Sequence, residues 1–220
     1  MLKPSALACW LLGSLLGGIP AASQIPNQQH PPQSASAYIQ AMLDPSRDAW
    51  QQPEEVLAKL AIKPGESIAD LGSGPGYFTL RFARAVGPAG KVYAIDISRE
   101  MLDYLGKQAR ADGFANIVSI LAEPHDPKLP PASVDLIFIC DTLHHISQRP
   151  DYYPLLLRAL KPGGRLVNID FEKKPLPVGP PVEMKIAKPD MIKEAESAGF
   201  RLIDQYDFLK YQYFLVFGRE

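Results

Sequence analysis

A short apolar segment followed by three closely spaced glycines constrains the fold of this chain more than any other feature. Residues 68–78 have the sequence IADLGSGPGYF, in which a carboxylate precedes glycines at every second position. Glycine accepts backbone angles that are closed to other residues and lets a ligand approach the main chain. Apolar residues then recur, from Phe78 onward, at the i, i+4, i+7 and i+8 spacing of one helix face. A strand, a glycine-rich turn and a helix in this order predict a nucleotide-type site in a parallel α/β sheet.

The residues of this loop distinguish between ligands. A dinucleotide-binding loop has a third glycine at the position that Tyr77 takes here, because helix and strand pack closely at that point. Asp70 also precedes the first glycine by two residues, and its charge would repel a pyrophosphate but attract an amino group and a sulfonium cation. A nicotinamide-dependent oxidoreductase, the first rival function, is therefore disfavoured.

A second carboxylate follows the next expected strand. Residues 91–98 have the sequence KVYAIDIS, an alternating apolar strand that ends at Asp96, 20 residues after Gly76. A carboxylate at this position can accept both hydroxyls of an adenosine ribose. In the alternative interpretation Asp96 only begins a turn, and Ser98 caps the following helix. The two roles are compatible.

With both motifs present, the chain resembles the class I S-adenosylmethionine-dependent methyltransferases. The likeness extends over residues 53–220 and includes DTLHHI after the expected fourth strand and LKPGGRLVNIDF before and through the fifth. Within this family the chain is most similar to small-molecule methyltransferases of the ubiquinone and menaquinone biosynthesis type. The resemblance implies S-adenosylmethionine as the cofactor and a small-molecule acceptor, which can be lipophilic.

The order of the expected elements agrees with the fold that this resemblance implies. Continuous apolar runs alternate with helical segments, as is typical of a parallel sheet covered on both faces. We expect an α/β, Rossmann-like, seven-stranded and mostly parallel sheet with helices on both faces and an antiparallel last strand. The expected strands are residues 68–70, 91–96, 117–121, 134–140 and 165–171, followed by a hairpin of residues 200–209 and 211–218.

Ligands in such sheets bind beyond the carboxyl ends of the strands, and this rule selects the candidate site. Glu123 stands where the family has an aspartate that contacts adenine, but it follows an alanine instead of the usual glycine. Asp126 is the alternative adenine contact, and residues 124–127 can also form a simple turn. The expected cofactor-binding residues are Asp70, Gly72, Gly74, Gly76, Asp96, Ile97, Glu123 and Asp141.

His144 and His145 are the candidate catalytic residues. A neutral imidazole can remove a proton from an acceptor near neutral pH. The alternative is that one of the two histidines caps or packs beneath the cofactor. Two adjacent histidines at the start of a helix do not converge on one ion, so we expect no metal site. Arg47, if it points inward, is expected to pair with the methionine carboxylate of the cofactor.

Charge and composition limit the partners of this chain. Its 220 residues carry a net charge of −1, and 46% of them are hydrophobic, which fits one globular domain with a substantial core. No run of lysine and arginine exceeds Lys173-Lys174, whereas nucleic acid usually binds to a clustered basic surface. We therefore expect no nucleic-acid partner.

The first 23 residues differ from the rest of the chain. Lys3 precedes an apolar stretch at residues 6–19, which is too short for a comfortable membrane span. Small residues then precede Gln24, as they do at a signal-peptide cleavage site. We expect a signal peptide, or an uncleaved N-terminal anchor, over residues 1–23. A flexible linker over residues 24–37 and a methyltransferase domain over residues 38–220 follow.

This N-terminal segment has consequences for location and function. A cleaved signal peptide predicts an exported, periplasmic protein, and an uncleaved segment predicts a membrane-anchored protein that faces the cytosol. The membrane is expected as a partner only through this segment. Because S-adenosylmethionine is made in the cytosol, export also raises a second rival function. This rival is an exported, non-catalytic binding module that keeps the methyltransferase fold.

Overall fold

The computed structural model describes residues 34–219 of the chain. The expected signal peptide or anchor, and the expected linker up to residue 33, lie outside the described residues. The linker was expected to end at residue 37, but helix α1 (Ala35–Met42) begins inside that range. Its start is stabilised because the Ser34 side chain accepts a hydrogen bond from the backbone N–H of Ala37.

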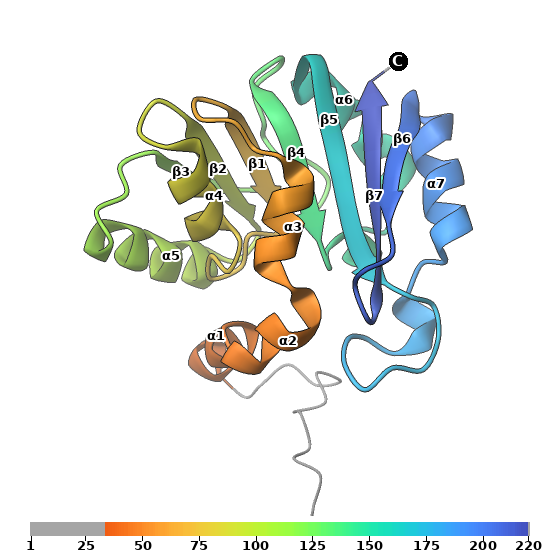
Figure 1. Cartoon of the computed structure of the whole chain (residues 1–220), viewed down its shortest axis with the longest axis horizontal. Coiled ribbons are helices and arrows are strands. Elements are labelled where there is room, and N and C mark those ends of the chain that lie inside the picture. The colour runs from red at the N-terminus through yellow and green to blue at the C-terminus, as the bar shows by residue number, and fades with distance from the viewer. Residues whose placement is uncertain (1–33, 220) are drawn as a thin grey trace, which may run out of the picture.

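Seven strands form one sheet in the order β3-β2-β1-β4-β5-β7-β6 (Figure 1). Neighbouring strands are parallel except that β7 runs antiparallel to both β5 and β6. The predicted mostly parallel sheet with an antiparallel last strand is thus confirmed. The strands are β1 (Ser67–Leu71), β2 (Lys91–Asp96), β3 (Ile117–Leu121), β4 (Val134–Cys140), β5 (Leu160–Phe171), β6 (Phe200–Tyr206) and β7 (Gln212–Arg219).

Strand β5 begins at Leu160, earlier than the expected Arg165. Leu160 pairs with Val134, and the register between β4 and β5 then shifts before Leu136 pairs with Arg165. Residues 161–164 (KPGG) therefore lie within an irregular extension of the strand.

Helices cover both faces of the sheet, as predicted. One core forms where α3 (Pro53–Leu60) and α4 (Thr79–Val86) pack on the sheet, and α5 (Arg99–Ala111) packs beside it over β2. The opposite core lies beneath α6 (Arg149–Ala159) and α7 (Lys188–Ser197). Within residues 34–219, no helix is long and apolar enough to cross a membrane.

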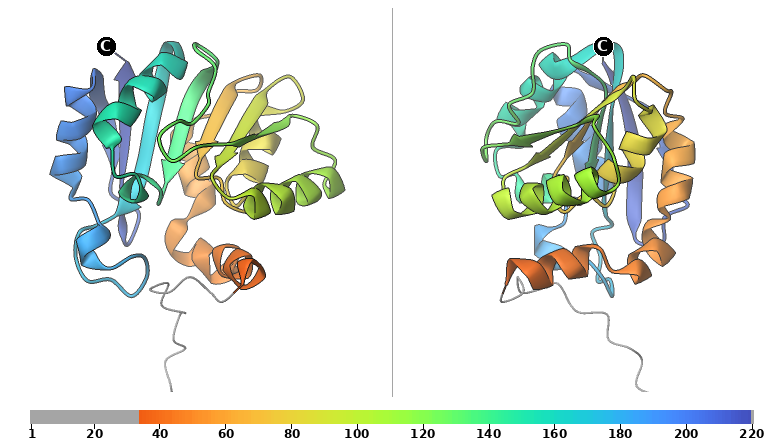
Figure 2. Two further views of the ribbon diagram at one scale, coloured as in Figure 1. Left: turned by 180° about the vertical axis from the view of Figure 1, so that it is seen from behind. Right: turned by 90° about the vertical axis from the view of Figure 1, so that its left-hand side faces the viewer.

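A short N-terminal segment lies across the carboxyl ends of the strands instead of on a face of the sheet (Figures 1 and 2). It consists of α1, the 3-10 turn η1 (Pro45–Arg47) and α2 (Asp48–Gln51). We call residues 35–51 the N-terminal cap. The segment of residues 172–187, which contains the 3-10 turn η3 (Val182–Met184), lies at the same end of the sheet (Figure 1). This end is where ligands bind in sheets of this kind.

Candidate active site

The glycine-rich loop after β1 adopts a backbone that only glycine accommodates without strain. Gly72, Gly74 and Gly76 have φ values of +77°, +53° and +101°, in the left-handed region that side chains disfavour. A Cβ atom at Gly72 would also lie 2.1 Å from the Oγ1 atom of Thr142, which follows β4. The loop therefore forms a cradle of bare main chain between the ends of β1 and β4.

Asp70 is a buried residue at the end of β1, just before this cradle. Its side chain is 3% exposed and accepts a hydrogen bond of 2.6 Å from the Thr79 hydroxyl at the start of α4. Burial raises the pKa of Asp70 to about 7, and the hydrogen bond from Thr79 only partly opposes this shift. The attraction of Asp70 for a cation therefore depends on pH near neutrality.

Asp96 joins the end of β2 to the glycine-rich loop. One carboxylate oxygen accepts the backbone N–H of Gly74, and the other accepts that of Ser98, both at 2.8 Å. Ser98 also accepts the N–H of Met101 and so caps α5, which confirms that interpretation. The side chain of Ile97 is 66% exposed and offers an apolar surface to a flat ring. The ribose role of Asp96 and the cofactor contact of Ile97 stay predictions.

Glu123 lies in a turn. Glu123 and Asp126 exchange backbone hydrogen bonds, so the simple turn expected over residues 124–127 is present. The Glu123 carboxylate pairs with the ammonium group of Lys128 at 2.6 Å, and Asp126 accepts the backbone N–H of Lys128. The adenine contact of either acid stays a prediction.

The N-terminal cap contacts the glycine-rich loop directly. A Cβ atom at Gly74 would lie 2.6 Å from the terminal methyl group of Met42 in α1. The Tyr77 hydroxyl donates a hydrogen bond to Asp48 in α2. The guanidinium group of Arg47 lies 4.1 Å from the centre of the Tyr77 ring, a cation–π distance. The cap therefore covers the loop from the solvent side.

Arg47 points inward and pairs with Asp141 at the end of β4. The nitrogen-to-oxygen distance is 3.5 Å, and Gln212 donates a hydrogen bond of 2.6 Å to the other oxygen of Asp141. Burial raises the pKa of Asp141 to about 6, although the charge of Arg47 opposes the shift. Asp141 has a φ of +55°, an unusual value that is most frequent at functional sites.

The sequence interpretation did not select the two glutamines of this network. Gln51 is fully buried and donates to the side chain of Gln212 at 2.9 Å, and its oxygen accepts from Arg47 at 3.1 Å. A polar residue at the start of the apolar strand β7 is the only signal that could have indicated Gln212. Nothing local indicated Gln51.

The two candidate catalytic histidines lie in the 3-10 turn η2 (Leu143–His145) and differ in their burial and partners. The Nδ1 atom of His144 lies 2.8 Å from the carboxylate of Asp170 on β5, and their side chains are 2% and 0% exposed. His145 is exposed, and its ring centre lies 4.1 Å from that of His144. Of these two histidines, only His145 is accessible to an acceptor. The sequence interpretation did not select Asp170, although this residue interrupts an apolar run.

Comparison with known proteins decides the family. A protein-family model described as a methyltransferase domain matches residues 62–205. The chain belongs to this family. It is a class I S-adenosylmethionine-dependent methyltransferase. The predicted family, fold and cofactor are thus confirmed.

A solved structure and curated relatives agree. A SAM-dependent methyltransferase from Aquifex aeolicus is 31% identical with a TM-score of 0.80, covering 85% of this chain and 99% of that one. A ubiquinone/menaquinone biosynthesis C-methyltransferase from Hahella chejuensis is 32% identical over 121 residues, 54% of this chain and 49% of the relative. The corresponding Vibrio cholerae enzyme is 34% identical over 112 residues. The chain thus spans about half the length of the curated relatives it matches.

The residues present fit this methyltransferase's cofactor. At each glycine of the cradle a Cβ atom would lie within 2.6 Å of a neighbouring side chain, so only a bare main chain can be approached this closely. The Ser73 hydroxyl within the cradle is buried without a hydrogen-bond partner, which is unusual for a polar group unless a ligand or water completes it. S-adenosylmethionine would be held by the cradle, by Asp96 and by Ile97, and it supplies an activated methyl group. Among residues 34–219, no group of three or more His, Cys, Asp or Glu side chains could hold a metal ion.

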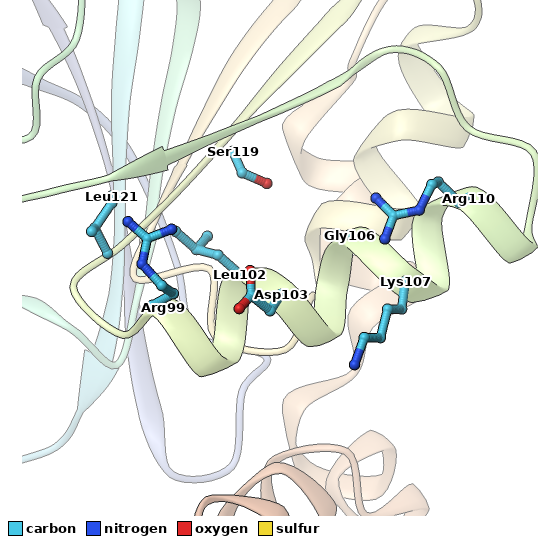
Figure 3. A pocket seen from close by; sticks show the side chains of 8 residues that line it. All are labelled: Arg99, Leu102, Asp103, Gly106, Lys107, Arg110, Ser119 and Leu121. Atoms are coloured by element: carbon cyan, nitrogen blue, oxygen red, sulfur yellow. The ribbon is translucent and has the colours of Figure 1, made fainter.

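A surface cavity lies at the sheet edge, between α5 and β3 (Figure 3). Its volume is about 470 Å³, and Arg99 and Arg110 lie at its two ends (Figure 3). It shares no residue with the candidate active site. It is lined by Arg99, Leu102, Asp103, Gly106, Lys107, Arg110, Ser119 and Leu121.

Proposed function

We propose that this methyltransferase transfers the methyl group of S-adenosylmethionine to a small-molecule acceptor. The observation that carries the proposal is the N-terminal cap. It covers the glycine-rich loop through Met42 and the Arg47–Asp141 ion pair. A covered site excludes water and suits an acceptor small enough to be enclosed, whereas a polymer needs an open surface. Excluding water and aligning the acceptor are the main tasks in methyl transfer from an already activated donor.

An aromatic cluster that includes Trp50 of the N-terminal cap supports a lipophilic acceptor. The ring of Trp50 in α2 lies 5.8 Å from that of Phe171 and 6.3 Å from that of Tyr211. Trp50 and Tyr211 are half-buried, so their rings offer apolar surface next to the carboxyl ends of the strands. The curated relatives, named for ubiquinone and menaquinone biosynthesis, support the same class of acceptor.

Other partners receive less support. The net charge of −1 gives no electrostatic basis for binding nucleic acid. Membership of the methyltransferase family leaves the alternative of a non-catalytic binding module without support.

We further propose, from the apolar segment at residues 1–23, that the protein is exported to the periplasm. An anchored protein facing the cytosol is the alternative, and it would have direct access to the cofactor.

Two measurements on the full chain test the proposal. Calorimetric titration with S-adenosylmethionine and S-adenosylhomocysteine should show binding that Asp96→Ala abolishes and that Asp103→Ala, on the outer side of α5, preserves. Incubation with isotope-labelled cofactor and separate small-molecule, RNA and protein fractions should then label the small molecules. Labelling confined to the RNA or protein fraction would refute the proposed acceptor class.

A further inference from the structure

Asp170 is a buried carboxylate that faces a single histidine. One of its oxygens accepts the backbone N–H of Phe171 at 2.8 Å and lies 2.8 Å from the Nδ1 atom of His144. The other oxygen is buried without a partner. A carboxylate with so few partners in the interior is costly unless a positive charge lies beside it. The geometry therefore favours a protonated His144 that donates its Nδ1–H to Asp170.

The other charged groups around this pair come from two further segments. Asp141 at the end of β4 adds negative charge, and Lys185, from the segment of residues 172–187, adds positive charge. The ammonium group of Lys185 is held by the backbone oxygen of Lys174 at 2.8 Å. Burial lowers the pKa of His144, but the hydrogen bond to Asp170 and the charges of both carboxylates outweigh burial, so that the pKa is raised overall. The two carboxylates therefore favour the protonated state of His144, and Lys185 opposes it only in part.

His145 experiences the opposite influence. Partial desolvation and then the charge of His144 lower the pKa of His145, and the charge of Asp170 opposes this shift only in part. The centres of the two imidazole rings lie 4.1 Å apart. The backbone N–H of His145 donates to the carbonyl of Thr142 at 2.9 Å, and Thr142 is the residue that contacts the glycine-rich loop at Gly72. The exposed His145 thus belongs to a short helical turn that begins at the residue contacting the cofactor cradle.

We propose that Asp170 and His144 are positioning residues that hold His145 as the proton acceptor of the methyl-transfer reaction. The inference rests on the proposed function and narrows its substrate class to acceptors whose attacking oxygen or carbon carries a proton. That atom gives its proton to His145, and the electron pair left behind forms the new bond to the methyl carbon. The bond between this carbon and sulfur breaks with its electrons remaining on sulfur. Thiolates and neutral amines attack without such a base.

Chemical modification of the full chain tests the placement and the charge of His145. Diethylpyrocarbonate reacts with neutral, accessible imidazoles, and mass spectrometry reports each histidine separately. We expect His145 to react with a pH midpoint below 6.5, the ordinary histidine value, and His144 to be protected by burial. At a S-adenosylhomocysteine concentration ten times the Kd, modification of His145 should slow roughly tenfold. Modification of the exposed His125 should not change.

Two variants test the positioning pair. His144→Gln removes the charge that lowers the pKa of His145 and should raise the pH midpoint of its modification. Asp170→Asn removes the support for that charge together with the smaller, opposing charge of Asp170, so it should raise the midpoint by less. Circular dichroism identifies a variant that fails to fold. The pH midpoint of His145 modification is then measured in the variant that does fold. Unchanged midpoints in the folded variants would overturn the inference, as would a midpoint at or above 6.5 in the unaltered chain.

The cofactor experiment separates this inference from the proposed function. Binding of S-adenosylhomocysteine without protection of His145 would overturn the inference alone. Absence of binding would overturn the proposed function and the inference with it. Finally, the methyl group in the labelled small-molecule product should be on oxygen or carbon, and a product methylated only on sulfur or nitrogen would overturn the substrate class.

Discussion

Asparagine at position 70 should stabilise the protein in a pH-dependent manner. Asp70→Asn removes a buried charge and keeps an oxygen that can accept the hydrogen bond from Thr79. Burial raises the pKa of Asp70 from 3.8 to about 7, and a shift of this size corresponds to roughly 4 kcal/mol. The folded state therefore binds a proton between pH 4 and pH 7 that the unfolded state has released, and the stability of the unaltered chain falls as pH rises through this window.

The variant has no such proton to release. Its excess free energy of unfolding should be near zero at pH 4 and should grow to roughly 4 kcal/mol above pH 8. Urea denaturation followed by circular dichroism at pH 4.5, 6 and 8.5 measures this difference. An excess of the same size at all three pH values would refute the reasoning, because a neutral packing effect has no pH dependence.

A matched control and a binding measurement complete this test. Asp135 is a less buried carboxylate on β4 whose pKa is lowered, because the hydrogen bonds from Lys161 and from the backbone of Ser67, with the charge of Lys161, together outweigh the effect of burial. Asp135→Asn should therefore destabilise the protein at neutral pH, the opposite sign. If the charge of Asp70 attracts the sulfonium group, Asp70→Asn should also bind S-adenosylmethionine about tenfold more weakly at pH 8. Unchanged affinity would assign Asp70 a purely structural role.

Three further predictions concern the loop, the cap and the N-terminus. Gly72→Ala places a methyl group against Thr142 at a φ of +77° and should cost roughly 1–3 kcal/mol in urea denaturation. Gly113→Ala, at +76° with open space around it, should cost less, and equal losses would contradict the clash. Arg47→Met leaves the buried Asp141 without its cation and should destabilise the protein by roughly 3–5 kcal/mol at pH 8 and by less at pH 5. A loss of stability that does not depend on pH would refute this explanation. Mass spectrometry of the mature protein should find Gln24 as its first residue, and an intact residue 1 would favour the anchor.

Local patterns predicted the fold well because they are direct consequences of burial. Apolar runs of five to seven residues bounded by turn residues gave strands such as β2 and β4 within a residue of their observed bounds. Glycines at every second position required the turn after β1, since three positive φ values occur there. The start of β5 was missed, because the pairing of Leu160 with Val134 depends on a register shift between β4 and β5.

The site was predicted only in part. The carboxyl-end rule selected Asp96 and the glycine-rich loop, which lie together and are joined by a hydrogen bond. It could not show that Asp70 is buried and bonded to Thr79, because alternation along a strand does not reveal which neighbour covers a side chain. It also treated the two adjacent histidines alike, although burial and the pairing with Asp170 distinguish them.

The sequence by itself determined the α/β class, the glycine cradle and the cofactor, because each depends on residues that are near one another in the chain. Only the tertiary structure decided that Arg47 meets Asp141, that two glutamines complete their network, and that Asp170 pairs with His144. Each of these contacts joins segments that are separated in the sequence and meet near the carboxyl ends of the strands. Their burial influences which of the ionisable side chains are charged at neutral pH. Protonation depends on desolvation and on neighbouring charge, and a linear sequence contains neither until the chain has folded.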